Sequence, residues 1–132
     1  MKTDFLCPKC RGFLNIGENL VFSVDKKGWN SGIVLLSSEL GNYSILHHQT
    51  FEMSDGEQFD FYCPICRHNL SVEGVDKFAQ VIMSEEGKES FVVFSKIKGE
   101  MSTFKISDKK VEAYYGIHAG TNIDFVSASF QK

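Results

Sequence analysis

Two pairs of cysteines are the residues best suited to chemistry in this chain of 132 residues. Each pair is spaced as Cys-Pro-x-Cys, with Cys7 and Cys10 near the start and Cys63 and Cys66 near the middle. Two thiolates separated by two residues can hold one metal ion from a tight turn, and two such turns complete a tetrahedral shell of four sulfurs. Soft thiolate ligands select zinc or iron over magnesium and calcium. We therefore expect Zn²⁺ bound by Cys7, Cys10, Cys63 and Cys66.

The residues around the two cysteine pairs repeat. Residues 5–16 align with residues 61–72 on the pattern F-x-C-P-x-C-R-x-x-L-x-[IV]. Two copies predict a pair of similar hairpins that face each other. The proline in each copy fixes φ within the turn, and we expect Gly12 or Asn69 to adopt the left-handed conformation that a tight turn often requires.

This arrangement resembles the zinc-ribbon group, in which two Cys-Pro-x-Cys-type knuckles at hairpin tips share one zinc. The resemblance covers residues 5–16 and 61–72 and implies a structural device that many unrelated functions share. The chain departs from compact ribbons because 52 residues separate Cys10 from Cys63. The strands between the knuckles are therefore expected to be an elaboration of the ribbon.

Other chemistries use the same cysteine spacing. Cys-Pro-x-Cys also resembles the redox turn of thioredoxins and glutaredoxins, but there the motif follows a strand and opens a helix. Here alternating, strand-like sequences follow each pair, at residues 11–16 and 67–72. Iron in the same four-sulfur shell and two disulfides are further alternatives, although paired cysteines in a reducing cytosol are more often metal ligands or redox centres.

Short alternating segments bounded by Gly, Asn and Ser predict a predominantly β fold. Three such segments lie between the knuckles, at residues 20–24, 32–36 and 43–47. After the second knuckle, four segments predict an antiparallel meander, at residues 78–83, 91–97, 102–106 and 111–115. Helical periodicity is nearly absent, and only residues 74–80 and 123–130 could form a turn or two of helix.

A hairpin is also predicted just before the second knuckle, around the turn sequence Ser-Asp-Gly-Glu-Gln. An odd-numbered loop would pair Met53 with Phe59 and Phe51 with Phe61. These four apolar side chains would then share one face of the hairpin.

These elements predict a zinc ribbon with long inserted strands, followed by a C-terminal antiparallel meander. We expect a ribbon lobe over residues 1–75 and a meander lobe over residues 76–132, packed as one unit. The chain length is that of a single domain.

Charge and hydropathy indicate where the protein acts. The formal net charge is −3, and acidic and basic residues interleave, which disfavours nonspecific binding to nucleic acid because such affinity rises with the number of Lys and Arg engaged. No apolar run is long enough for a signal peptide or a membrane span. We expect a cytoplasmic protein without membrane contact.

Few other residues suggest a site. Arg11 and Arg67 directly follow the knuckles, where we expect them to offset the negative charge of a zinc ion held by four thiolates rather than to contact a partner. Trp29, beside a lysine turn, is expected to cover one end of the core or to join a binding surface. The histidines are not expected to be ligands; they are His47, His48, His68 and His118.

The sequence thus predicts a non-catalytic zinc protein that acts as a small interaction or adaptor module, with another protein as its partner. No catalytic motif occurs, and a closed shell of four cysteines leaves no coordination position to activate water. Association with RNA, the ribosome or DNA is the first alternative, which the resemblance implies. A redox- or metal-responsive regulator is the second. The partner surface is expected on the meander, residues 78–115, together with the loop around Trp29.

Overall fold

The computed structural model describes residues 3–26, 30–49, 51–120, 122–123 and 126. In these residues the chain forms eleven β-strands. The first five are β1 (Thr3–Leu6), β2 (Asn15–Ile16), β3 (Asn19–Lys26), β4 (Asn30–Ser37) and β5 (Ile45–His47). The remaining six are β6 (Asp60–Tyr62), β7 (Ser71–Val72), β8 (Val75–Glu85), β9 (Lys88–Ser95), β10 (Thr103–Ser107) and β11 (Lys110–Tyr115).

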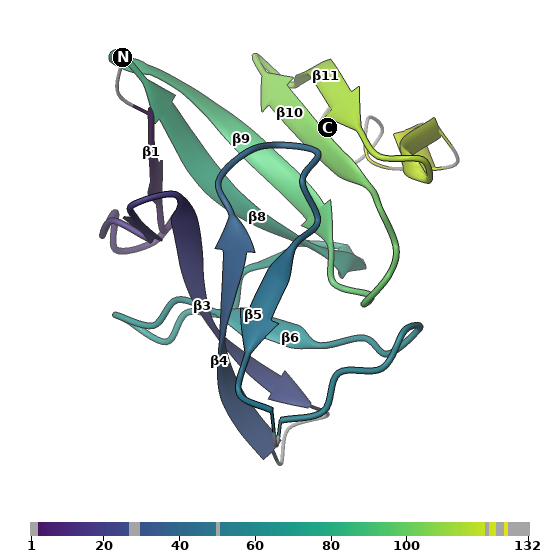
Figure 1. The fold of residues 1–132 in the computed structure, drawn as a ribbon. Helices are drawn as coiled ribbons and strands as arrows, with labels where there is room; N and C mark the ends of the chain where they lie inside the picture. Colours follow the sequence, from purple (N-terminus) through teal and green to yellow (C-terminus); the bar gives the residue numbers. More distant parts are fainter. Residues whose placement is uncertain (1–2, 27–29, 50, 121, 124–125, 127–132) are drawn as a thin grey trace.

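The strands form two antiparallel sheets, which confirms the predominantly β fold. One sheet, here called the meander sheet, has the order β1-β8-β9-β10-β11, with β7 also paired to β8. The other, here called the insert sheet, has the order β2-β3-β4-β5, with β6 also paired to β3. The meander sheet lies above the insert sheet in the view of Figure 1. The predicted meander is confirmed as β8 to β11.

The internal repeat extends far beyond the knuckles in the structure. Strands β1 to β5 form a first half and β6 to β10 a second half with the same order of pairings, since β3 pairs β4 and β4 pairs β5 as β8 pairs β9 and β9 pairs β10. The first strand of each half is exchanged: β1 pairs β8, and β6 pairs β3. Phe5 lies opposite Met83 and Phe61 opposite Val24, so the two exchanges are equivalent.

The main core lies between the facing sides of the two sheets. Alternate residues of each long strand point into it, as the period of two in a strand requires. They include Leu20, Phe22 and Val24 on β3 and Ala79, Val81 and Met83 on β8. The rings of Phe22 and Phe61, both in the insert sheet, meet edge to face at 5.5 Å, and Phe61 meets Phe94 of β9 at 5.3 Å. The two sheets are therefore joined by apolar burial.

A second core covers the opposite side of the meander sheet. Phe78 and Phe104 pack there with Ala119 and Val126, which lie in a helical segment after β11. Asn122 donates a hydrogen bond of 2.9 Å from Nδ2 to Oγ of Ser102 and so fixes this segment. The meander sheet is thus buried on both sides.

Two sequence-based expectations about secondary structure are wrong. Residues 51–53 form no strand, and β6 pairs β3 instead of forming a hairpin with them. The side chains nevertheless share one environment, since Phe51, Phe59 and Phe61 are all in the main core and Met53 packs against it. The predicted helical turn at residues 74–80 is instead a turn residue followed by the start of β8 at Val75, and most of residues 123–130 lie outside the described residues.

The meander sheet contains strands from both sides of the expected lobe boundary at residue 75. Strands β1 and β7 lie before residue 75, yet both pair β8 in the meander sheet. The main core also takes residues from both sides of the boundary. The division at residue 75 stays a prediction.

A buried lysine connects the sheets beside the core. The Lys96 side chain is 0% exposed; its Nζ lies 2.9 Å from Oδ1 of Asp60 and 2.7 Å from Oγ of Ser71. Asp76 is the second carboxylate nearby, at 3.6 Å. The ammonium group has therefore exchanged water for partners on β6 and β7, and it depends on them because a buried charge without a partner is costly.

Removing one partner of Lys96 should cost more than removing the lysine itself. We expect Asp60→Ala to lower the free energy of unfolding by about 2 kcal/mol, because the ammonium group stays buried, and Lys96→Met to change it by less than about 1 kcal/mol. Asp55→Ala, which breaks an exposed pair with Lys98, should cost less than about 1 kcal/mol. Urea denaturation of the three variants measures this order. A loss in Lys96→Met as large as that in Asp60→Ala would contradict it.

Candidate metal centre

The two knuckles lie where the chain crosses between the sheets. The first connects β1 of the meander sheet to β2 of the insert sheet, and the second connects β6 of the insert sheet to β7 of the meander sheet. The two crossings therefore run in opposite directions. Buried residues anchor both ends of each knuckle, with Phe5 and Leu14 on one and Phe61 and Leu70 on the other.

The two knuckles have the same backbone hydrogen bonds. In the first, the N–H of Arg11 donates to the carbonyl of Cys7 at 2.9 Å and the N–H of Cys7 to that of Gly12 at 3.1 Å. In the second, the N–H of Arg67 donates to the carbonyl of Cys63 at 2.9 Å, and the N–H of Cys63 donates to the carbonyl of His68 at 3.0 Å. The repeat seen in the sequence is thus a repeat of backbone structure.

These turns bring the four sulfurs of Cys7, Cys10, Cys63 and Cys66 together. All four lie within 4.8 Å of one another. The Sγ atoms of Cys7 and Cys66 are 3.7 Å apart, and those of Cys10 and Cys63 are 3.8 Å apart. The cluster therefore has the donors and the size to hold one metal ion, with two ligands from each knuckle.

The inner and outer cysteines differ in their surroundings. Cys7 and Cys63 are buried, whereas Cys10 and Cys66 lie at the surface. Burial raises the pKa of the Cys7 thiol and raises the pKa of Cys63 to about 12. A hydrogen bond from the backbone N–H of His68 lowers the pKa of Cys66 to about 7. Without a cation, the inner sulfurs thus favour the thiol, and the outer Cys66 loses its proton more readily than they do.

Backbone N–H groups point at the inner sulfurs. Lys9 donates to Sγ of Cys7 at 3.3 Å, and Ile65 donates to Sγ of Cys63 at 3.3 Å. Such donors partly offset the negative charge of thiolates around a metal. The knuckle backbone, rather than a charged side chain, supplies this stabilisation.

The expectation for the left-handed residues of the knuckles is wrong. Arg11 and Arg67 have φ values of 59° and 66°, whereas Gly12 and Asn69 have no positive φ. The side chains of the two arginines reach other partners than sulfur. Arg11 forms an ion pair with Glu89 on β9, and Arg67 donates from Nη1 to Oγ of Ser23 at 2.8 Å.

Gly12 allows close packing of one knuckle on the other. A Cβ at this position would lie 2.5 Å from Cδ1 of Ile65 and 3.3 Å from Sγ of Cys10. The absent side chain therefore leaves room for Ile65 of the second knuckle beside the sulfurs. The role of Gly12 is therefore packing and not a left-handed φ.

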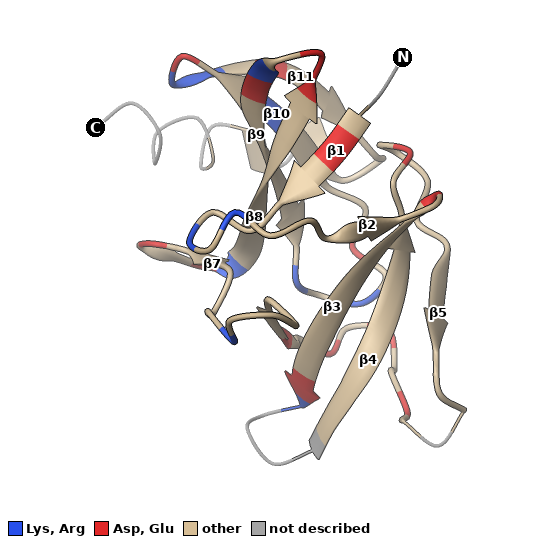
Figure 2. Cartoon of the chain, turned by 90° about the vertical axis from the view of Figure 1, so that its left-hand side faces the viewer, with Lys and Arg blue, Asp and Glu red and all other residues tan. Residues whose placement is uncertain are grey.

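The remaining candidates lie elsewhere. His47 is exposed and its Nδ1 contacts the carbonyl of His48, while Nδ1 of His118 accepts a hydrogen bond from the N–H of Met101. Within the described parts of the chain, no second group of three or more His, Cys, Asp or Glu is close enough to hold a metal. Trp29 lies outside the described residues. Figure 2 shows Lys and Arg dispersed among Asp and Glu, with no continuous basic stripe on the cartoon.

The strain at Arg11 can be measured by substitution. With both variants lacking the guanidinium group, Arg11→Gly should be more stable than Arg11→Val by about 2 kcal/mol, because a left-handed φ is costly for a β-branched residue and free for glycine. The control is exposed Lys110 in β11. There Lys110→Val should be more stable than Lys110→Gly, since a strand favours Val over Gly. Chemical denaturation of the metal-loaded proteins tests both pairs. Equal stability of the two Arg11 variants would show that this turn carries no strain.

No helix in the described residues is long and apolar enough to cross a membrane. No family model, curated protein or solved structure matches the chain. The four-cysteine cluster, on a two-sheet β scaffold, is therefore the feature on which an assignment of function depends.

Proposed function

We propose that this protein is a non-catalytic zinc protein in which one Zn²⁺, held by Cys7, Cys10, Cys63 and Cys66, is structural and the folded chain acts as a binding module. One observation carries the proposal. Zn–S bonds of about 2.3 Å in a tetrahedron place the sulfurs about 3.8 Å apart. The separations of Cys7 from Cys66 and of Cys10 from Cys63 are 3.7 and 3.8 Å, and all four sulfurs lie within 4.8 Å of one another.

The choice of zinc follows from the donors. Four thiolates with tetrahedral spacing suit zinc or iron and do not suit hard cations such as magnesium. Zinc is the metal of structural sites closed by four cysteines. Such a shell has no open position for water or substrate, which supports a role without catalysis.

The position of the cluster supports a structural role. Each knuckle carries the chain from one sheet to the other, so an ion between them would join both crossings at one point. The strands that precede the knuckles, β1 and β6, are the ones exchanged between the halves. Binding energy at the cluster would therefore stabilise the exchange as well as the turns.

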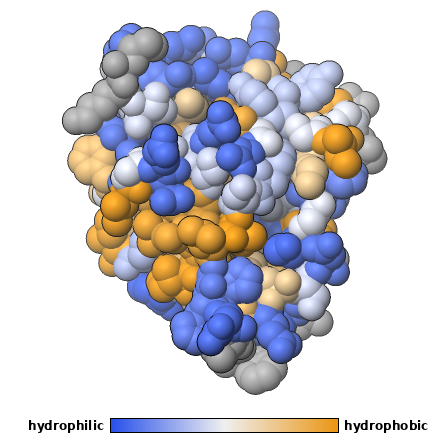
Figure 3. All heavy atoms as spheres, in the orientation of Figure 1, coloured by the Kyte–Doolittle hydropathy of each residue, from blue (hydrophilic) through white to orange (hydrophobic). Residues whose placement is uncertain are grey.

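A role in binding is supported by apolar side chains that the fold leaves at the surface. On the outer side of the insert sheet, Leu46 of β5 lies opposite Leu35 of β4 and is 60% exposed, and Ile33, two residues from Leu35, is 52% exposed. Figure 3 shows apolar side chains gathered over β4 and β5. Exposed apolar patches on soluble proteins often mark contacts with other molecules. The meander surface predicted from the sequence is the other candidate for partner contact, and Tyr114 on it is 55% exposed.

The metal content tests the proposal directly. We expect one zinc per chain by elemental analysis of protein purified without added metal, and colourless protein, which distinguishes zinc from iron. The double variant Cys63→Ser, Cys66→Ser should lose the metal, because two sulfurs cannot complete the shell. Replacing exposed Ser54 and half-buried Ser107 by Ala, two serines outside the knuckles, is the control and should leave the content at one. Two metals per chain, or full retention by the cysteine variant, would contradict a shared site.

Removal of the metal tests the structural role. Metal binding at such a site contributes on the order of 10 kcal/mol to folding at neutral pH, so a strong chelator should abolish the dispersed amide spectrum of the N-terminal half. Readdition of zinc should restore it. An amide spectrum that stays dispersed, with an unchanged melting temperature after complete loss of metal, would show that the site is not structural.

A further inference from the structure

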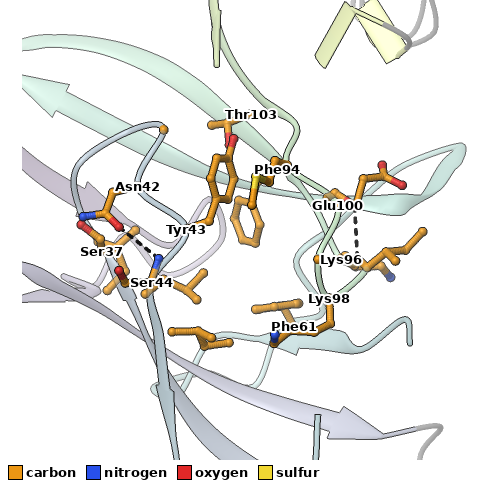
Figure 4. Close-up of a pocket in the computed structure, with 18 of the residues that line it drawn as sticks. Ser37, Asn42, Tyr43, Ser44, Phe61, Phe94, Lys96, Lys98, Glu100 and Thr103 are labelled. Carbon is orange, nitrogen blue, oxygen red and sulfur yellow. Dashed lines mark hydrogen bonds between the residues drawn. The ribbon is translucent and has the colours of Figure 1, made fainter. Parts of the chain in front are cut away.

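A cleft between the two sheets lies apart from the cysteine cluster. Its volume is about 370 Å³, which is within the range of pockets that bind small molecules. β4 and β5 and the loop between them form one wall, and the end of β9 with the loop to β10 forms the other. Figure 4 shows Tyr43 and Phe94 on one side of this space and Phe61 on the other.

The cleft is where the main core is open. Five large apolar side chains pack against this core without being fully buried, and every one of them lines the cleft: Leu36, Leu40, Ile45, Met53 and Phe94. Leu36 on β4 lies opposite Leu20 on β3, and Phe94 on β9 lies opposite Ala79 on β8. Leu36 and Phe94 therefore occupy equivalent positions in the two halves. The cleft thus follows from the duplicated fold, at the place where the sheets diverge.

Hydrogen bonds fix the loops on both sides of the cleft. The hydroxyl of Tyr43 lies 2.7 Å from Oγ1 of Thr103 and donates to the carbonyl of Tyr115 at 3.1 Å, which fixes the β4–β5 loop to the meander sheet. On the other side, the N–H of Lys98 donates to the carbonyl of Glu57, and Gly56 donates to that of Lys98, both at 2.8 Å. The loops that line the cleft are therefore held in place by hydrogen bonds.

The charges at the rim select against an anion. Nζ of Lys98 is already paired with Asp55 at 3.3 Å, and Nζ of Lys96 with Asp60 at 2.9 Å. Glu100 is paired with Lys77 at 3.4 Å. Among the described residues, Glu39 has no cation within ion-pair distance; its Oε1 accepts a hydrogen bond only from an amide, that of Asn42. The rim thus carries an uncompensated negative charge.

We propose that this cleft binds a small, planar, mainly apolar molecule that is uncharged or carries one positive charge. The aromatic rings of Phe59, Phe61 and Phe94 and the thioether of Met53 suit a flat aromatic body. The rim carboxylates suit a neutral or cationic end group and repel an anionic one. This inference goes beyond the proposed function, because the site uses neither the cysteines nor a protein partner.

Three fluorescent probes test the ligand class on the metal-loaded full chain. N-phenyl-1-naphthylamine is neutral, and 8-anilino-1-naphthalenesulfonate has the same rings with a sulfonate added. We expect saturable binding of the neutral probe and roughly tenfold weaker binding of the sulfonate. The cationic probe 9-aminoacridine should bind at least as well as the neutral one. Tighter binding of the sulfonate than of the neutral probe would overturn the proposal.

Variants place the site. Met53→Trp should fill the cleft and weaken binding of the neutral probe by roughly tenfold or more. The control Ile117→Trp adds the same ring at a position that is 81% exposed and does not line the cleft, so binding should not change. Glu39→Lys should strengthen sulfonate binding, and Glu73→Lys, with the same change of charge outside the cleft, should not. Equal effects within either pair would overturn the assignment.

Methyl NMR of the unmodified protein guards against a variant that fails to fold. Ring-current shifts caused by the neutral probe should appear at Leu36, Ile45 and Met53. Shifts confined to Ile33 and Leu46 on the outer side of the insert sheet would overturn the proposal. Zinc content, measured on every sample, separates this outcome from a failure of the proposed metal site.

Discussion

The structure depends on a reciprocal exchange of strands, held together at one point. Each half of the chain gives its first strand to the long strand of the other half, β1 to β8 and β6 to β3. Both donated strands lead directly into a cysteine knuckle, and the two knuckles meet with their sulfurs within 4.8 Å. Phe5 on β1 and Phe61 on β6 are buried in the main core, which fixes the two donated strands on the core side. The cluster and the core are thus two ends of one connection between the halves.

This arrangement explains why the knuckles resemble each other more than the rest of the halves do. Two sulfurs at a fixed spacing in turns with identical backbone hydrogen bonds require Cys at matched positions, and Pro and Arg recur there as well. In the strands, by contrast, any apolar side chain of suitable volume can fill a core position. Leu36 and Phe94 occupy equivalent places with different side chains. The duplication is consequently plain in the fold and visible in the sequence only around the metal ligands.

Local chemistry could be predicted from the sequence, and pairing between distant segments could not. The cysteine cluster and the meander depend on spacing and alternation within short segments, and both were predicted. The hairpin predicted before the second knuckle failed because β6 pairs β3, a distant strand, and no turn residue reports such a choice. Residue type favours Gly12 or Asn69 as the left-handed residue, but the hydrogen bonds from Arg11 to Cys7 and from Arg67 to Cys63 place the left-handed φ at the two arginines, one residue before Gly12 and two before Asn69. The cleft depends on how two sheets diverge and has no signal in the sequence.

The exchange of strands also sets the order in which this protein can assemble. The β3–β4 and β8–β9 hairpins are local, but β1 and β6 find their partners only when both halves exist, a topology of high contact order that folds slowly. Cys7 and Cys66 are 59 positions apart, so on the ribosome the first knuckle emerges well before the second. During that interval its thiols have only half of their site, and the edge of β3 that later receives β6 is open to other chains. The period of synthesis is therefore when this chain is most exposed to oxidation and aggregation.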